Sequence, residues 1–337
     1  MDVIILTNLH HSLIPYFCPV TNVGKDITRA TQLLKDGYCV AVPTETVYGL
    51  AADGTNVDAV LKIFNTKQRP QTNPLILHFP TSQAIEPYIK NFPEKLQKLA
   101  THFWPGPLTL LLPKSELVPE MITAGNERVA VRVPRHPMFL ELLSKLDFPL
   151  AAPSANKYGS ISPTQAIHVQ QQFGEEIPYI LDGGACENGL ESTIVGMENE
   201  TVVVYRLGSI AVESIAEILE EEPLISNVHN NGKLLASGMV KHHYAPNTPL
   251  YFFDEQFTFT QSDGFIFFEK KRNDRSSEQV IILSEKGDLS VAAANLYAAL
   301  HEMDKQGFQR IFIEKFPDVD LGRTINDRLT RATAKFS

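Results

Sequence analysis

Short apolar runs alternate with amphipathic helical stretches along the first two-thirds of this chain, and this alternation is its most constraining feature. CVAVP (39–43) and LILHF (75–79) predict buried strands, and the stretch behind Asn56 repeats apolar residues with helical spacing. Strands that alternate with helices indicate an α/β fold. Further strands are expected at 108–112, 129–133, 179–181, 192–195 and 202–206, and further helices near 26–35, 93–103, 137–145, 163–173 and 212–221.

The pattern lapses near Ile225, after which the chain is rich in Asn and Gly and shows little periodicity, as is typical of a linker. A second α/β unit then begins with the apolar runs PLYFF, GFIFF and QVIIL, a helix after Ser290, the strand RIFIE and a last helix over 323–334. A chain of 337 residues is long enough for two domains. The sequence therefore predicts domains at 1–229 and 250–337, with a linker at 230–249.

Composition argues against several classes of protein. The formal net charge of −9 and a pI near 5.6 give no sign of a dominant surface for nucleic acid. Cys18, Cys39 and Cys186 lie far apart without a CxxC pair, so we expect no zinc site, no disulfide framework and a reducing, cytoplasmic location. The N-terminal segment has a short apolar run without a basic region before it, so we expect neither a signal peptide nor a membrane span.

Two cations, Lys67 and Arg69, stand close together before the run LILHF. Such a pair is best tolerated when an anion neutralises it, and Arg offers a fork for phosphate oxygens while Lys offers a point charge. The alternative is two solvated surface side chains, as in most charge clusters. Asn73 can orient a loop or bind a ligand, and His78 lies within an apolar strand, where histidines more often have a core role.

Small polar residues gather in LAAPSANKYGSISPTQAIHV. Ser154 and Asn156 follow an apolar strand, the usual position of ligand-binding groups in open α/β sheets. Ser162 and Pro163 are expected to open a helix, with Ser162 as its N-cap, and a helix start offers N–H donors that suit a phosphate. An ordinary capped helix explains Ser162 without a ligand.

Glycines in LDGGACENGLESTIVG allow the backbone to pass close to a turn or a ligand before Ser192 and Thr193 begin a strand. Motifs of other chemistries are absent from the sequence: there is no GxxxxGKS/T, no GxGxxG after the first strand, and no GxSxG or HExxH. Any ATP site is therefore not a P-loop.

Five segments resemble, in order and spacing, the motifs of the YrdC-type threonylcarbamoyl-AMP synthases. They are PTETVYGLAAD (43–53), KQRPQTNPLILH (67–78), VAVRVPRHP (129–137), SANKYGSISPTQAIHV (154–169) and DGGACENGLESTIVG (182–196). HHYAPNTP and INDRLTRATA, further on, resemble the longer members of that family. The resemblance implies a YrdC-like twisted open α/β domain followed by a smaller Rossmann-like α/β domain.

The resemblance also implies an activity, the synthesis of L-threonylcarbamoyl-AMP from L-threonine, bicarbonate or CO2 and ATP, with release of pyrophosphate. The product would serve threonylcarbamoyladenosine modification of tRNA next to the anticodon, through downstream tRNA threonylcarbamoyl-transfer proteins. Mg²⁺ is expected with ATP, without identified protein ligands. The linker is expected to close over the pocket through the run Lys241-His242-His243-Tyr244; the alternative is that this run only packs between the domains. Direct binding of tRNA is left open.

Matching positions carry the implied site residues. The family's KxR and SxN signature marks as catalytic Lys67, Arg69, Ser154 and Asn156. The implied threonine contacts are Thr44, His78, Ser192 and Arg132, the last as partner of the substrate carboxylate. The implied ATP contacts are Arg69, Asn73, Arg128, Ala152, Ser154, Ser162, Arg206 and Tyr244. The sequence departs from the family pattern at Ser237 and Leu207, where prolines are expected.

Two other functions remain open from the sequence. Carbamoyl-transfer enzymes of hydrogenase maturation contain a similar module but also carry zinc-finger cysteines, which three scattered cysteines do not supply. A non-catalytic RNA-binding module is disfavoured by the acidic pI. Release of pyrophosphate that depends on threonine and bicarbonate would separate the alternatives.

Overall fold

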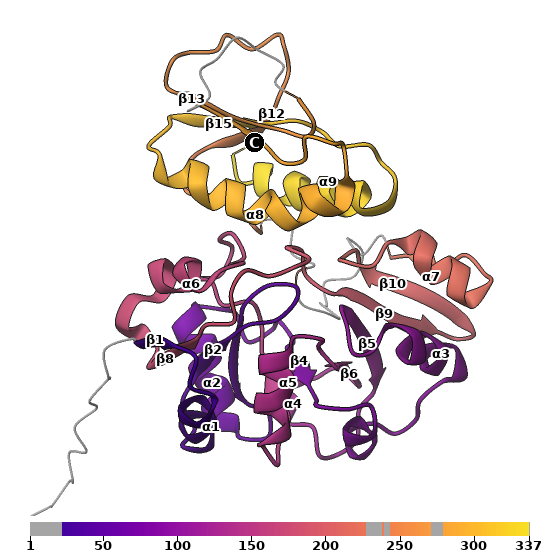
Figure 1. The fold of residues 1–337 in the computed structure, drawn as a ribbon. Helices are drawn as coiled ribbons and strands as arrows, with labels where there is room; N and C mark the ends of the chain where they lie inside the picture. Colours follow the sequence, from indigo (N-terminus) through magenta and orange to yellow (C-terminus); the bar gives the residue numbers. More distant parts are fainter. Residues whose placement is uncertain (1–21, 227–237, 239–242, 271–278, 337) are drawn as a thin grey trace, which may run out of the picture.

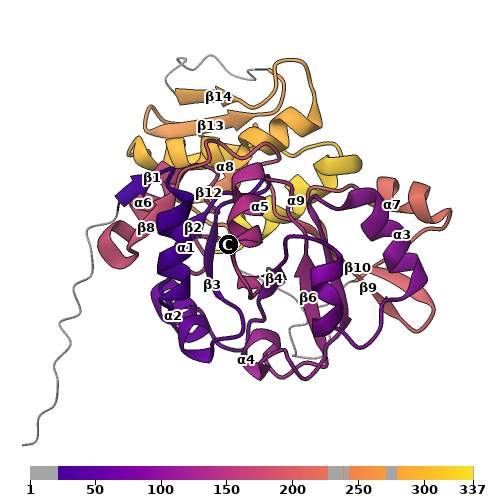
Figure 2. The same ribbon diagram turned by 60° about the horizontal axis from the view of Figure 1, so that its bottom comes forward.

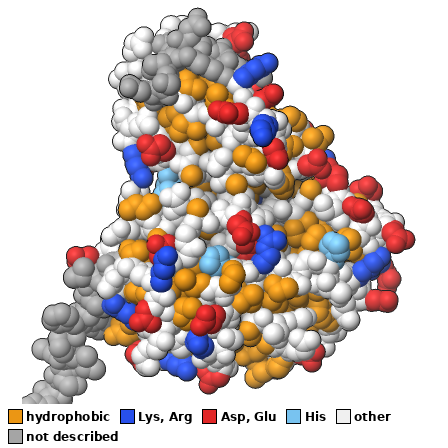
Figure 3. Space-filling view, viewed as in Figure 1, with side chains coloured by type: hydrophobic (Ala, Val, Ile, Leu, Met, Phe, Trp, Pro, Cys, Tyr) orange, Lys and Arg blue, Asp and Glu red, His pale blue; other side chains and the backbone are white. Residues whose placement is uncertain are grey.

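Two α/β domains are stacked on each other, as Figure 1 shows. The structure is a computed structural model that describes residues 22–226, 238, 243–270 and 279–336. No helix within these ranges is long and apolar enough to cross a membrane, and the N-terminal segment discussed above lies outside them, as does Cys18. On the face in Figure 3, acidic and basic side chains are interspersed rather than gathered into one basic patch.

The larger domain is built on an open, mixed 11-stranded sheet with the strand order β1-β8-β2-β3-β7-β4-β6-β5-β9-β10-β11. The strands are β1 (Asn22–Gly24), β2 (Val40–Val42), β3 (Gly49–Asp53), β4 (Ile76–His78), β5 (Leu108–Pro113), β6 (Arg128–Arg132), β7 (Leu150–Ala151), β8 (Tyr179–Leu181), β9 (Thr193–Glu198), β10 (Thr201–Arg206) and β11 (Leu224–Ile225). Every strand predicted in this domain is present, and the open α/β fold is confirmed.

Helices cover both faces of the sheet. They are α1 (Ile27–Lys35), α2 (Val57–Lys67), α3 (Glu94–Phe103), α4 (Glu120–Thr123), α5 (Pro137–Ser144), α6 (Ala166–Phe173) and α7 (Val212–Leu219), with short 3-10 turns at Gln83–Tyr88 and Gly174–Glu176. Helices α1 and α5 bury their apolar residues in one cluster with β2 and β8, whereas α2, α3, α6 and α7 contribute to the larger cluster of the domain.

Local capping explains where α1 and α2 begin. The Asp26 carboxylate accepts from the Arg29 N–H at 3.0 Å, so Asp26 caps α1 rather than belonging to it. The Asn56 side chain accepts from Asp58 and Ala59 N–H groups, as the sequence predicts. The prediction for Ser162 is wrong. Helix α6 begins at Ala166, and the Ser162 hydroxyl instead donates to the carboxylate of Glu191 in the same domain.

The smaller domain has a parallel four-stranded sheet in the order β12-β15-β13-β14. Its elements are β12 (Leu250–Phe252), β13 (Asp263–Phe267), β14 (Val280–Ile282), α8 (Leu289–Lys305), β15 (Arg310–Ile313) and α9 (Asp320–Thr333). Parallel strands and helices agree with the predicted Rossmann-like unit, but α8 and α9 both lie on the face toward the larger domain in Figures 1 and 2. Aromatic side chains such as Phe265 cover the other face.

The two domains share one apolar core. Val47, Ile161 and Leu190 of the larger domain pack in the same cluster as Leu296 of α8 and Ile325 of α9. Gly189 explains the close approach: its φ is +70°, and a Cβ there would lie 2.5 Å from the Ala293 carbonyl oxygen of α8.

The predicted linker, 230–249, is described only at residue 238 and from residue 243 onward. Gly238 has a φ of +82°, and a Cβ on it would lie 2.6 Å from the Tyr244 hydroxyl, so this position requires glycine. The proposed departure at Ser237 falls outside the described residues, as do Lys241 and His242.

Candidate active site

A pocket opens where several strands of the large sheet end. His78 ends β4 and Arg132 ends β6, and the two are paired neighbours in the parallel register. Arg206 ends β10, and Ala152 and Ser154 follow β7. All five line the pocket. They stand at the carboxyl ends of their strands, which is the edge where open α/β sheets bind ligands.

The pocket brings together most of the predicted site. All four predicted threonine contacts and half of the predicted ATP contacts line it, namely Thr44, His78, Arg132, Ala152, Ser154, Ser192, Arg206 and Tyr244. Four more, Lys67, Arg69, Asn73 and Asn156, form a buried cluster joined to Ser154, and Ser162 bonds a carboxylate of the wall. Arg128 is the exception.

Arg128 lies at the other end of β6 from Arg132. The two residues are four positions apart along the strand, which separates their Cα atoms by roughly 13 Å. The Arg128 guanidinium donates to the Tyr205 hydroxyl at 2.8 Å and to the Met197 carbonyl at 3.0 Å. The structure therefore does not bring the predicted ATP contact Arg128 to the pocket.

The Arg132 guanidinium is buried and held from three sides. Nη2 donates to Glu45 Oε1 at 2.6 Å, and Nη1 donates to the Thr46 hydroxyl at 3.1 Å. Nε donates to the Gly106 carbonyl at 3.1 Å. A guanidinium carries five N–H donors, so one N–H on each terminal nitrogen remains for a substrate carboxylate. The predicted bidentate contact is compatible with this arrangement.

Glu45 is the residue of this wall that sequence reasoning missed. It is 2% exposed, and its Oε2 accepts from the Arg135 N–H at 3.1 Å. Burial would raise the pKa of its carboxyl, but the charge and hydrogen bond of Arg132 outweigh that effect and lower the pKa below its usual value. The available signal was a lone acid within PTETVYGL, because a buried carboxylate requires a cationic partner.

The Thr44 hydroxyl fixes the turn between β2 and β3. It accepts from the Thr46 N–H at 3.0 Å and donates to the Val47 carbonyl at 2.7 Å. Residues 44–47 therefore present a preformed wall, with Thr44 on the pocket side.

Two histidines at the site are uncharged at neutral pH. Burial and then the charge of Arg132 lower the pKa of His78 to about 3. Burial, followed by the charges of Arg69 and Lys67, lowers the pKa of His243 well below its usual value. His78 can thus offer a hydrogen bond to a substrate, but not a charge.

Lys67 joins the two halves of the predicted catalytic signature. It is the last residue of α2 and 1% exposed, so the alternative of a solvated surface cation is wrong. Its Nζ donates to the carbonyls of Ser154 and Asn156. Burial, and then the charges of Arg69 and Lys157, lower the pKa of Lys67 well below its usual value. An arriving polyanion would raise that pKa again.

Arg69 is 6% exposed, so it too is not a solvated surface cation. Its Nη2 donates to the Pro74 carbonyl at 3.0 Å, and its Nε donates to the Asn73 carbonyl at 3.4 Å. Burial lowers its pKa to about 10, so Arg69 keeps its charge at neutral pH. The Asn73 side chain in turn donates to the Tyr158 hydroxyl at 3.0 Å.

Arg206 and Ser192 form another part of the pocket wall. Arg206 Nη2 donates to the Ser192 hydroxyl at 2.9 Å and to the Ser192 carbonyl at 2.8 Å. The Ser192 hydroxyl also shares a hydrogen bond of 2.7 Å with Thr109. Arg206 is buried, so a fixed guanidinium stands on this side of the pocket as well.

Tyr244 places the end of the linker on the pocket wall. It is 1% exposed and stacks on Tyr297 of α8, with ring centroids 5.9 Å apart. The predicted reach of Tyr244 into the site agrees with this position.

Several buried polar atoms at the site have no hydrogen-bond partner in the described part of the chain. They are Asn73 Oδ1, His78 Nδ1, Asn156 Oδ1, His243 Nδ1 and the Tyr244 hydroxyl. Buried polar groups are normally satisfied, so a concentration of unsatisfied ones suits a ligand-binding site. Within the same ranges no three His, Cys, Asp or Glu residues are placed to hold a metal ion.

A buried pocket with fixed guanidinium groups, at the carboxyl edge of an open α/β sheet, is the arrangement of an enzyme for anionic substrates. Comparisons with known proteins narrow that class. Residues 32–208 match the Sua5, YciO and YrdC family model, described as "Telomere recombination". Residues 210–334 match the model "Threonylcarbamoyl-AMP synthase, C-terminal domain".

Named relatives span nearly the whole chain. A threonylcarbamoyl-AMP synthase of Bacillus subtilis is 38% identical over 91% of this chain and 92% of its own. One of Pyrococcus abyssi is 36% identical over 91% of this chain and 94% of its own. The crystal structure of P. abyssi Sua5 complexed with L-threonine has a TM-score of 0.83 and 34% identity, covering 93% of this chain and 97% of that one. The chain belongs to the threonylcarbamoyl-AMP synthase family of enzymes, which excludes the non-catalytic RNA-binding alternative.

Proposed function

We propose that this enzyme makes L-threonylcarbamoyl-AMP from L-threonine, bicarbonate or CO2 and ATP, and releases pyrophosphate. One observation carries the proposal: Arg132, with donors to spare for a carboxylate, and Arg206 line the same pocket, and the buried cations Lys67 and Arg69 form a cluster joined to its wall at Ser154. Arg132 keeps two donors for the threonine carboxylate, while Lys67, Arg69 and Arg206 provide positive charge for phosphates. The L-threonine bound to the P. abyssi relative supports the choice of amino acid.

The reaction proceeds in two steps. The threonine amine first takes up CO2, losing a proton, or condenses with bicarbonate, losing water; either route gives a carbamate. A carbamate oxygen then attacks the α-phosphorus of ATP, and the bond to the β,γ-diphosphate breaks, which leaves the mixed anhydride threonylcarbamoyl-AMP and pyrophosphate. The carbamate and ATP that react in the second step are both anionic, so fixed donors aimed at the developing charge contribute about 3–4 kcal/mol each.

The protein supplies orientation and charge rather than a resident metal. The only acid among the pocket-lining residues described is Glu191, and both its oxygens already accept hydrogen bonds. Mg²⁺ would thus enter with ATP, held by the phosphates and water, as is usual for this ion. A carbamate hydrolyses readily in water, so the buried Tyr244 and His243 at the end of the linker would help to exclude it.

We further propose that the product is passed to tRNA threonylcarbamoyl-transfer proteins in the cytoplasm, for modification of tRNA next to the anticodon. The free, buried thiols of Cys39 and Cys186 are compatible with a reducing compartment. The interspersed charges in Figure 3 give no support to tight binding of tRNA on that face.

The direct experiment measures pyrophosphate release with ATP, L-threonine and ¹³C-bicarbonate, and identifies the product by mass. We expect release that requires all three substrates and a product that carries one ¹³C atom. Pyrophosphate release that is independent of threonine, or a product without the label, would refute the proposed reaction.

A further inference from the structure

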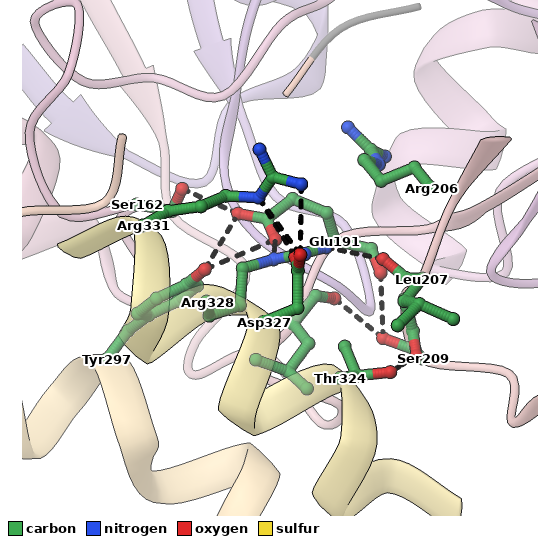
Figure 4. Close-up of polar contacts among 12 residues, drawn as sticks. Ser162, Glu191, Arg206, Leu207, Ser209, Tyr297, Thr324, Asp327, Arg328 and Arg331 are labelled. Carbon is green, nitrogen blue, oxygen red and sulfur yellow. Dashed lines mark hydrogen bonds and ion pairs between the residues drawn. The ribbon is translucent and has the colours of Figure 1, made fainter. Parts of the chain in front are cut away.

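One buried carboxylate of the pocket wall has no role in the proposed chemistry. Glu191 directly precedes Ser192 and is 6% exposed. Figure 4 shows its carboxylate between the two domains. Oε1 accepts from the Ser162 hydroxyl at 2.7 Å, and both oxygens lie 3.2 Å from the Tyr297 hydroxyl of α8. Oε2 accepts from Nε of Arg328, in α9, at 2.8 Å.

Arg328 reaches the pocket wall at three points, although it belongs to the smaller domain. Besides Glu191 it donates through Nη2 to the carbonyl of Leu207, the residue after Arg206. Its guanidinium carbon lies 4.9 Å from the ring centroid of Tyr244. Arg328 is 1% exposed. A single side chain of α9 thus contacts the wall before Ser192, the wall after Arg206 and the end of the linker.

The charges explain why such a contact matters to a pocket for polyanions. Burial would raise the pKa of Glu191, but the charges of Arg328 and Arg206 and the hydrogen bonds outweigh it and lower the pKa, so the carboxylate stays ionised. Without Arg328, the negative charge of Glu191 would face incoming phosphates and would draw on Arg206, the neighbouring cation of the wall. A like charge a few ångströms away in a buried site opposes anion binding strongly.

We propose that Arg328 is a positioning residue for ATP: it neutralises and orients Glu191, so that this carboxylate neither repels the phosphates nor cancels the positive charge of Arg206. The smaller domain then takes part in the active site without touching a substrate. This inference rests on the proposed function only in taking ATP as the nucleotide.

The test is a double-mutant cycle read by calorimetric binding of a non-hydrolysable ATP analogue with Mg²⁺. Arg328→Gln should weaken binding by about 10- to 100-fold, because the uncompensated charge of Glu191 then opposes the phosphates. Once Glu191 is neutral, Arg328 no longer has a pocket carboxylate to compensate, and only its pair with Asp327, outside the pocket lining, remains. Glu191→Gln combined with Arg328→Gln should therefore bind the analogue within about threefold of Glu191→Gln alone, because residues that act through one contact are non-additive.

Arg323→Gln is the matched control. Arg323 also lies on α9 and also crosses the domain interface, to Glu213 at 3.0 Å, but their side chains are 30% and 45% exposed and lie outside the pocket lining. Its removal should leave analogue binding unchanged. Wild-type affinity in folded Arg328→Gln would overturn the proposal.

A purely structural role for Arg328 predicts a different cycle, in which Arg328→Gln weakens binding equally in the wild-type and Glu191→Gln backgrounds. If the single variant Arg328→Gln does not fold, the comparison of Glu191→Gln with the double variant Glu191→Gln/Arg328→Gln still decides the question. A difference of tenfold or more in their affinity for the analogue would refute the proposal. Because binding is measured without turnover, failure of the proposed reaction would appear separately, as absent pyrophosphate release in the wild type.

Discussion

The buried ion pair between Glu45 and Arg132 offers a sharp test of how the threonine end of the pocket is built. Both side chains are almost fully buried, at 2% and 4% exposed, and their closest atoms are 2.6 Å apart. Glu45→Gln preserves the shape and one acceptor oxygen but removes the negative charge. The variant therefore leaves the Arg132 charge without its buried partner.

The magnitude follows from that geometry. Breaking one side of a buried ion pair costs about 3–5 kcal/mol, and the retained acceptor favours the lower end, about 3 kcal/mol. For a domain of this size each kcal/mol lowers the melting midpoint by about 2–4 °C, so we expect a fall of about 6–12 °C. Thermal unfolding followed by circular dichroism measures it.

Glu187→Gln is the control, because Glu187 pairs with the neighbouring Arg135 at 2.9 Å on the surface, with side chains 73% and 53% exposed, respectively. Such pairs contribute less than about 1 kcal/mol. A midpoint for Glu45→Gln within 2 °C of that control would refute the reasoning.

L-Threonine gives a second measurement on the same variant. Its carboxylate would supply the negative charge that Arg132 has lost, so threonine should raise the midpoint of Glu45→Gln by more than that of the wild type. An equal rise in the two proteins would show that the substrate carboxylate does not reach Arg132.

Three further predictions concern the proposed reaction. Arg69→Ala should lower pyrophosphate release about 100-fold, the usual loss of one preorganised charge contact, and near-wild-type release would exclude a phosphate role for Arg69. The lowered pKa of Lys67 means that phosphate binding should be accompanied by proton uptake, so ATP affinity should increase as the pH falls between the pKa values of Lys67 in the free and the ATP-bound enzyme. Calorimetry in buffers of different ionisation enthalpy measures this proton uptake, and a binding enthalpy that does not depend on the buffer would contradict it. Threonine amide should be a very poor substrate and serine a poor-to-moderate one, and equal turnover of the amide would argue decisively against Arg132 as the carboxylate site.

The apolar runs and local caps of the sequence were sufficient for most of the fold. Strands such as β5 are continuous apolar segments, and Asp26 and Asn56 cap their helices within three residues of themselves. The short strand β3 was missed because Gly49–Asp53 consists mainly of small residues with little strand propensity. Ser162 was wrongly predicted to be a helix N-cap because a serine before a proline has the same local sequence whether or not it caps a helix. Its actual partner, Glu191, lies 29 residues away in the sequence.

The candidate site, like the fold, has parts that local sequence predicts and parts that depend on residues distant in the sequence. The four threonine contacts that the resemblance implies all line one pocket. Local sequence could not show that Lys67 is buried, because its carbonyl partners lie 87 and 89 residues further along. Arg128 and Arg132 lie on the same side of one strand, so alternation alone does not separate them; only their positions at opposite ends do. Long-range polar partners, rather than apolar periodicity, are what the sequence left undetermined.

The apolar cluster shared by the two domains has a consequence for how the chain unfolds. Val47 and Leu190 are covered by side chains of α8 and α9, so separation of the domains would transfer apolar surface of both to water. The domain limits at 229 and 250 therefore divide the sequence, but we expect the two domains to unfold together as one cooperative unit. Opening of the pocket by detachment of the smaller domain would cost much of the stability of that domain, which leaves adjustment of shorter segments as the less costly route for substrates to enter and leave.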